Sequence, residues 1–177
     1  LRIVKGTLQQ SLELEWLPLV NDGVVEQLMV SIRDVTEANV LRGKNKTNEM
    51  EWRLITLFLK AGEARFREYV LSNTLLLTQS KHYLLRKGEE DKSISSIPVD
   101  ALFRNMHTIK GNSRAFDFDD MSDLGHQAES LLSGFRENGI TQSGVESAVV
   151  IVDSLLALLN RYKRLAIERI GWDVEAL

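Results

Sequence analysis

His107 and Lys110 are the residues of this chain whose types and spacing best suit chemistry. The segment 99–118 reads VDALFRNMHTIKGNSRAFDF, and its apolar residues recur with the 3.6-residue period of a helix. On such a helix, four residues fall along one strip at the edge of the apolar stripe: His107, Lys110, Gly111 and Arg114. The pattern therefore predicts an imidazole, an ammonium and a bare stretch of backbone on one exposed surface.

These residue types suit a histidine that carries a phosphoryl group. A neutral imidazole is a nucleophile near neutral pH, and an ammonium one turn away can neutralise charge on phosphoryl oxygens. As a surface cation, Lys110 is expected to slow transfer when replaced by Ala, without unfolding the protein. Gly111 leaves room for a partner at a cost of about 1 kcal/mol in helix propensity. The plain alternative is a partly buried surface histidine without a chemical role. The residues around His107 must decide between these two interpretations.

Four long amphipathic helices are predicted to position this segment. They run from 63 to 87, from Pro98 to the break at 117–120, from there to about 137, and from 143 onward. Asp119 is expected to cap the third, and Ser143 with Glu146 forms a capping-box pattern at the fourth. Long helices joined by short loops form an antiparallel bundle. The predicted fold class is mainly α, an antiparallel four-helix bundle.

The first 37 residues follow a different pattern. Leu12, Leu14 and Trp16, and then residues 24–35, show β-type alternation, and Asn21-Asp22-Gly23 is a strong hairpin turn between them. The sequence predicts an N-terminal β-hairpin followed by a connector helix over 38–49. Gly43 and the polar run 44–48 weaken that helix, so a bend is expected there.

The composition excludes several classes of function. The 177 residues contain no cysteine, so neither a disulfide nor a thiolate–zinc site can form. With 22 basic and 25 acidic residues the net charge is -3, which gives no electrostatic case for nucleic acid or an anionic membrane. No uninterrupted apolar run approaches the roughly 18 residues of a membrane span, and no membrane contact is expected. The chain begins with Leu1, and we expect it to be part of a longer protein.

The segment HTIKGNSRAF resembles the HxxKG phosphoacceptor motif of histidine phosphotransfer (Hpt) domains, with Phe116 and Phe118 as the aromatic residues that follow the motif. The downstream segment 123–132, DLGHQAESLL, resembles the adjacent helix of chemotaxis-kinase phosphotransfer domains. The resemblance covers about residues 50–170. It implies that His107 is phosphorylated at Nε2, that Lys110 steadies the phosphoryl group, and that Gly111 opens the docking surface.

The resemblance also implies a hydrogen-bond network of Glu129 and His126 around the phosphohistidine, and Arg114 adds a second cation to the docking surface. On a helical wheel, Glu129 lies at the flank of its apolar stripe, where it can accept a hydrogen bond from Nδ1 of His107. His126 points nearly away from the stripe, so its place in the network is the weaker of the two.

The segment 15–37, EWLPLVNDGVVEQLMVSIRDVTE, resembles the last two strands of a PAS sensor domain, which commonly end in an Asp-x-Thr-Glu sequence like that of residues 34–37. The expected organisation is therefore a PAS remnant over 1–37, the connector over 38–49, the phosphotransfer domain over 50–170 and a tail over 171–177. The rest of a PAS fold is absent, so the remnant is expected to bind no cofactor.

The resemblance implies a cytoplasmic, bacterial phosphocarrier module of a two-component phosphorelay. Its expected partners are a histidine kinase catalytic domain and a response-regulator receiver domain. No cofactor, no metal and no catalytic activity of this chain alone are expected, although the parent protein is a candidate sensor histidine kinase. One alternative is the dimerisation and phosphoacceptor region of a histidine kinase, but Thr108 follows the histidine where an acidic residue and then a proline are usual.

Two further alternatives stay open. The first is a bundle that only binds a partner, and the intact His107 and Lys110 argue against it because such a bundle does not need them. The second is a metal site of His107, His126 and Glu129, and it is disfavoured because its ligands would lie outside the bundle core. The hairpin has an apolar face that something must cover. A second copy of the hairpin, giving a homodimer, is the expected cover, and packing on the chain's own bundle is the alternative.

Overall fold

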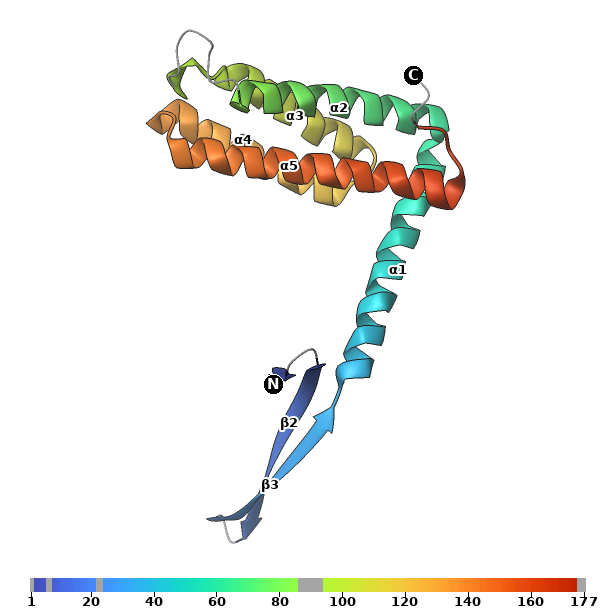
Figure 1. The fold of residues 1–177 in the computed structure, drawn as a ribbon, viewed down its shortest axis with the longest axis vertical. Helices are drawn as coiled ribbons and strands as arrows, with labels where there is room; N and C mark the ends of the chain where they lie inside the picture. Colours follow the sequence, from blue (N-terminus) through green and yellow to red (C-terminus); the bar gives the residue numbers. More distant parts are fainter. Residues whose placement is uncertain (1, 6–7, 22–23, 86–93, 175–177) are drawn as a thin grey trace. The chain divides into compact units, whose positions relative to one another are not determined.

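The computed structural model describes residues 2–5, 8–21, 24–85 and 94–174. The chain divides into two compact units, residues 1–51 and 52–177, which are described separately here. Figure 1 shows the elements in chain order.

The first unit contains the predicted hairpin and one additional strand. Strands β1 (Arg2–Lys5), β2 (Leu8–Asn21) and β3 (Val24–Asp34) form an antiparallel sheet in that order. Asn21 pairs with Val24, so two residues connect β2 to β3. Those two predicted turn residues, Asp22 and Gly23, lie outside the described residues.

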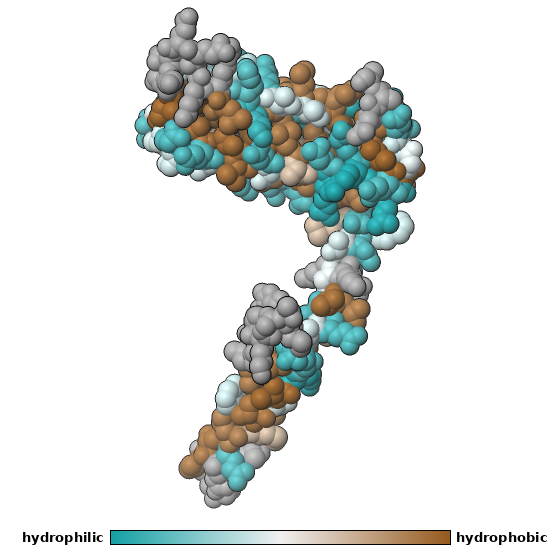
Figure 2. Space-filling model, viewed as in Figure 1, coloured by the Kyte–Doolittle hydropathy of each residue, from teal (hydrophilic) through white to brown (hydrophobic). Residues whose placement is uncertain are grey.

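One face of the hairpin is apolar and exposed. The register pairs Leu14 with Ile32, Trp16 with Val30 and Pro18 with Leu28, and opposed residues point to the same face of a sheet. Trp16 is 60% exposed and Ile32 is 63% exposed. Figure 2 shows this apolar surface along the hairpin.

Helix α1 (Thr36–Ala61) follows β3 directly. Asp34 accepts hydrogen bonds from the backbone N–H and the hydroxyl of Thr36, and these bonds lower the pKa of the Asp34 carboxyl. The predicted connector over 38–49 is thus part of one continuous helix that extends to Ala61, and no break occurs at Gly43. A single glycine costs a helix about 1 kcal/mol, which a helix of this length tolerates.

The second unit is the predicted antiparallel four-helix bundle. Its helices are α2 (Glu63–Leu85), α3 (Val99–Ala115), α4 (Asp119–Asn138) and α5 (Gln142–Leu165), which lie alongside one another in Figure 1. A short 3₁₀ turn (Ile94–Ser96) precedes α3, and a π-helical turn (Ala166–Ile170) continues α5. The predicted end of α2 at Gly88 lies outside the described residues.

Aromatic rings fill one end of the bundle core. Phe58 of α1 lies against Phe66 at 4.5 Å between ring centroids, and Phe118 is fully buried beside Tyr162 at 4.9 Å. Trp172 also contacts Phe66, and Val174 is buried. The described part of the segment expected to be a tail, up to residue 174, therefore contributes to the core.

Two predicted caps differ from the structure. Helix α5 is capped by Thr141, whose hydroxyl accepts from the Gly144 N–H at 3.1 Å, and not by the Ser143 and Glu146 pair. A Cβ at Gly144 would lie 2.5 Å from the Phe135 ring, so this close approach sets where the helix starts. Helix α4 starts at Asp119 itself and has no side-chain cap. Asp119 stays in the first turn, where a carboxylate is favourable, and bonds to Arg53.

The segment Gln142–Ile170 is long and apolar enough to cross a membrane by length and composition, and an 18-residue window within it has a mean hydropathy of 1.5. The sequence has no uninterrupted apolar run there, because Asp153 and Ser154 divide it. In this structure one face of α5 packs into the bundle core through a row of buried residues: Val145, Ala148, Val152, Leu155 and Leu159. Such a face is what a core helix of a bundle presents.

Candidate functional site

His107 lies at the exposed edge of α3, next to α4. Its side chain is 68% exposed, and its Nδ1 lies 2.8 Å from Oε1 of Glu129 on α4. In the described part of the chain no hydrogen bond reaches its Nε2. One ring nitrogen is therefore held by the protein, and the other is open to solvent.

Glu129 is a buried carboxylate that binds two basic side chains. Its residue is 7% exposed, Oε1 contacts His107, and Oε2 accepts a hydrogen bond from Nζ of Lys110. Burial raises the pKa of Glu129, but the hydrogen bonds from Lys110 and His107 outweigh burial and hold its pKa below the ordinary value of 4.5. Glu129 is therefore ionised at neutral pH.

An ionised acceptor fixes the tautomer of the imidazole. Because a carboxylate without a proton can only accept, the hydrogen bond requires the proton to be on Nδ1 of His107. In the neutral ring, the lone pair is then on Nε2, which has no hydrogen-bond partner among the described residues. This arrangement leaves a nucleophilic nitrogen at the surface.

Lys110 differs from the expectation of an exposed cation. Its side chain is only 13% exposed, because the ammonium contacts Glu129 and does not extend into solvent along the surface strip. A lysine stem is long and flexible enough to bury its methylenes while its ammonium reaches a partner. Lys110 thus neutralises the buried carboxylate in the unmodified protein, beside the ring of His107.

Gly125 lets α4 approach α3 closely. It is buried, and a Cβ added there would lie 3.1 Å from Cβ and 3.3 Å from Cα of Lys110. Glu129 follows one turn later on the same face of α4, so this approach brings its carboxylate within reach of α3. The sequence reasoning missed Gly125. Its signal was a glycine inside a helical pattern, where it costs about 1 kcal/mol unless packing requires it.

The other predicted site residues lie around this centre. Nδ1 of His126 is 3.9 Å from Glu129, beyond hydrogen-bond distance, and its side chain is 68% exposed. Gly111 is exposed with nothing within 4 Å of an added Cβ, and Arg114 donates to Ser122 at 3.3 Å. The structure brings together His107, Lys110 and Glu129, leaves His126 at the edge, and puts Gly111 and Arg114 along the exposed strip.

The opposite face of α3 is held to α2 by polar side chains that the sequence reasoning did not identify. Contacts that join the helices include Tyr69 with Ser113 at 3.0 Å, Asn73 with Asn112 at 3.3 Å, and Ser80 with Asn105 at 3.1 Å. Asn73, Ser80 and Ser113 are fully buried. Buried hydrogen bonds are directional, so they fix the rotation of α3 and thereby the outward direction of His107.

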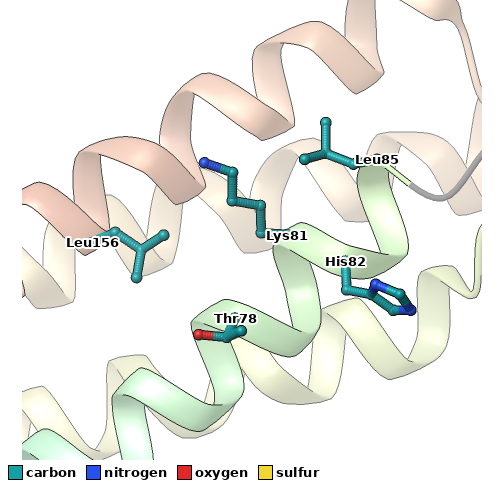
Figure 3. A pocket seen from close by; sticks show the side chains of 5 residues that line it. All are labelled: Thr78, Lys81, His82, Leu85 and Leu156. Atoms are coloured by element: carbon teal, nitrogen blue, oxygen red, sulfur yellow. The ribbon is translucent and has the colours of Figure 1, made fainter.

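A cluster of three or more His, Cys, Asp or Glu side chains with the geometry of a metal site does not occur among the residues that the structure describes. The described region also has a hollow between α2 and α5, lined by Thr78, Lys81, His82, Leu85 and Leu156 (Figure 3). There Lys81 binds Asp153 at 2.7 Å, and the ring of His82 extends away from Leu156. In the part of the chain that the structure describes, no carboxylate is hydrogen-bonded to His82 as Glu129 is to His107.

Comparisons with known proteins found several partial matches to this chain. The chain is 31% identical to "Chemotaxis protein CheA" of Halobacterium salinarum over 105 residues, which are 58% of this chain and 14% of that protein. It is 34% identical over 73 residues to the protein of the same name from Treponema pallidum, covering 41% of this chain and 8% of that protein. It is 31% identical over 85 residues to the protein of the same name from Borreliella burgdorferi, covering 48% of this chain and 9% of that protein.

This chain thus aligns with only a small part of the length of these relatives. No solved structure gives a significant match. The family described as "Hpt domain" matches residues 77–166, which include the C-terminal part of α2 and all of α3, α4 and α5. With that match over half of its length, the chain belongs to the Hpt domain family.

Proposed function

We propose that His107 is the phosphoacceptor of a two-component phosphorelay, receiving a phosphoryl group from a kinase or receiver domain and passing it to a receiver aspartate. The observation that supports this most is the exposed imidazole whose Nδ1 is bonded to an ionised, buried carboxylate. That bond selects the tautomer with a free lone pair on Nε2.

In the proposed step, the Nε2 lone pair of His107 forms a P–N bond as the bond between phosphorus and the donor oxygen breaks. The leaving oxygen takes the bonding electron pair. The Nδ1 proton stays on the ring, which becomes cationic, and the carboxylate of Glu129 balances that charge at 2.8 Å. The reverse step moves the phosphoryl group to a carboxylate oxygen of a receiver, breaking the P–N bond and restoring the neutral imidazole.

Lys110 is proposed to stabilise the phosphoryl oxygens. In the unmodified protein its ammonium binds Glu129 beside the histidine. A positioned cation that stabilises transferring phosphoryl oxygens is a recurring element of phosphoryl transfer. His126 is proposed to have a lesser part, since it lies 3.9 Å from the same carboxylate.

The partners are proposed to be a histidine kinase catalytic domain and a response-regulator receiver domain in the cytoplasm. Gly111 and Arg114 form the proposed docking surface, because the first is exposed without a side chain and the second lies one turn along the strip. The relatives named chemotaxis protein CheA support a signalling context, although this chain aligns with only 8–14% of their lengths.

The segment 1–37 is proposed to be the end of a PAS sensor domain. Its support is the resemblance together with the paired strands β2 and β3 and the Asp34–Thr36 contacts that lead into α1. We also propose that the apolar hairpin face, with Trp16 and Ile32 exposed, pairs with a second copy of the chain. Residues 50–170 are proposed as the extent of the phosphotransfer domain.

The function is tested by following radioactive phosphate from a phosphorylated receiver domain to the chain and back. The expected adduct on the chain is labile in acid and stable in base, as a P–N bond is, and label returns to a fresh receiver. Label that is stable in acid, or no exchange with any receiver of a representative panel, would contradict the proposed phosphocarrier role.

A further inference from the structure

The ring of His107 needs a second restraint. With 68% of the side chain exposed, its one hydrogen bond to Glu129 fixes Nδ1 but leaves the ring free to tilt about that bond. Transfer in line with a donor requires the Nε2 lone pair to keep one direction. A neighbouring side chain that contacts the ring plane would supply that restraint.

Phe103, one turn before His107 on α3, lies beside the imidazole. The two ring centroids are 6.4 Å apart and the planes differ by 10°. This separation and angle are those of an offset aromatic pair. The phenyl ring therefore lies parallel to the imidazole and limits its tilt.

Phe103 is itself held in place from α4. The guanidinium carbon of Arg136 lies 4.1 Å from the centroid of the Phe103 ring, a close cation–π contact. Asp100 fixes that guanidinium, since its Oδ1 accepts from Nε at 3.0 Å and lies 2.8 Å from Nη2. Helix α4 thus reaches the histidine twice, directly through Glu129 and indirectly through Arg136 and Phe103.

We infer that Phe103 is a positioning residue for phosphoryl transfer at His107, and that Asp100 and Arg136 hold it in that role. This inference rests on the proposed function. Phe103 does not contact the phosphoryl group in the proposal. It keeps the imidazole plane, and therefore the Nε2 lone pair, in the direction needed for an in-line partner.

The test measures the initial rate of phosphorylation of the full chain by phosphoramidate, and the attachment site of the phosphoryl group on the ring by phosphorus and nitrogen NMR. Phe103→Leu keeps an apolar side chain but removes the flat ring. It is expected to lower the rate on the order of tenfold and to raise the fraction of label on Nδ1. Phe103→Tyr keeps a flat ring and is expected to restore the wild-type rate and attachment site.

Phe116→Leu is the matched control. Phe116 is also partly exposed on the same segment and also carries an arginine, Arg65, at 5.5 Å from its ring, but its ring contacts within the described residues are with Tyr69, Phe118 and Arg65 and not with His107. Its loss is expected to leave the wild-type rate and attachment site unchanged. A Phe103→Leu chain that matches wild type in both readouts overturns the inference, as does an equal loss in the Phe116→Leu chain.

Two further outcomes separate the inference from the proposed function. If the wild-type chain takes no label at His107, the proposed function fails and this inference fails with it. If wild type is labelled and Phe103→Leu does not fold, as judged by circular dichroism, Arg136→Gln decides, because its side chain is a surface group whose loss leaves no cavity. A severalfold lower rate in Arg136→Gln supports the inference, and an unchanged rate overturns it.

Discussion

At the scale of single residues, one carboxylate organises the site. Glu129 is buried, binds Lys110 and His107 at once, and has a pKa below 4.5 because those hydrogen bonds outweigh its burial. A buried ion pair of this kind is destabilised when either partner is removed, since the other charge then stays buried and unpaired. Lys110→Ala should therefore lower stability as well as slow transfer, which revises the expectation for a surface cation.

The lowered pKa of Glu129 sets a pH dependence. Its contribution to stability is present above the ordinary pKa of 4.5 and is lost as the pH falls through the lowered value. Glu129→Gln should cost about 1–3 kcal/mol of unfolding free energy at pH 7, and this difference should shrink below about pH 4.5. Denaturant unfolding at several pH values measures it, with the exposed Glu137→Gln on the same helix as the control. A difference that stays constant with pH would show that the charge of Glu129 does not stabilise the fold.

Gly111 gives a prediction that separates chemistry from docking. A Cβ at Gly111 meets nothing within 4 Å, so Gly111→Ala should raise stability by up to about 1 kcal/mol through helix propensity. If the bare backbone serves a partner, transfer to a receiver domain should slow while labelling by phosphoramidate stays at the wild-type rate. Wild-type rates for Gly111→Ala in both reactions would show that Gly111 has no docking role.

At the scale of elements, the spacing of α3 and α4 decides whether the site forms. Gly125→Ala places a Cβ 3.1 Å from Cβ of Lys110, which should push the helices apart and weaken both contacts of Glu129. Phosphorylation should slow, and the gain of about 1 kcal/mol expected from helix propensity should be absent. Gly134→Ala on the same helix has open space around it and should gain that stability at the wild-type rate. Identical behaviour of the two variants would contradict the role of Gly125.

The helices were predictable from the sequence because each carries its own apolar period. The strip around His107, the bundle and the hairpin follow from patterns within single elements. What the sequence did not reveal depends on packing between elements. These features are the contact of Lys110 with Glu129, the close approach of α4 to α3 at Gly125, and the polar contacts between α2 and α3. The cap of α5 was wrong for the same reason, because Gly144 must fit against Phe135.

At the scale of the whole molecule, the chain consists of a small sheet unit and a bundle unit, each with its own contacts. Among the described residues, the bundle core contains none from the hairpin. A chain that begins at Thr47 should therefore keep a folded bundle with an active His107.

The hairpin is the proposed dimer contact, and a truncation and two substitutions test it. The full chain should sediment as a dimer at concentrations on the order of tens of micromolar, and the chain that begins at Thr47 as a monomer. Trp16→Lys, on the apolar face, should also give a monomer. Leu17→Lys should stay dimeric, because Leu17 pairs with Met29 and lies on the other face. Monomers throughout would show that the hairpin does not pair.

The central claim is that His107 alone carries the phosphoryl group, and the most direct measurement compares three single variants. The full chain and its His107→Gln, His82→Gln and His126→Gln variants are labelled with phosphoramidate, and the acid-labile label is counted after confirming folded helical spectra. Among the contacts of the described residues, His107 is the one histidine held by a buried carboxylate at hydrogen-bond distance. Loss of all label in His107→Gln, with full label in the other two, is the predicted result. Label that persists in His107→Gln would contradict the account.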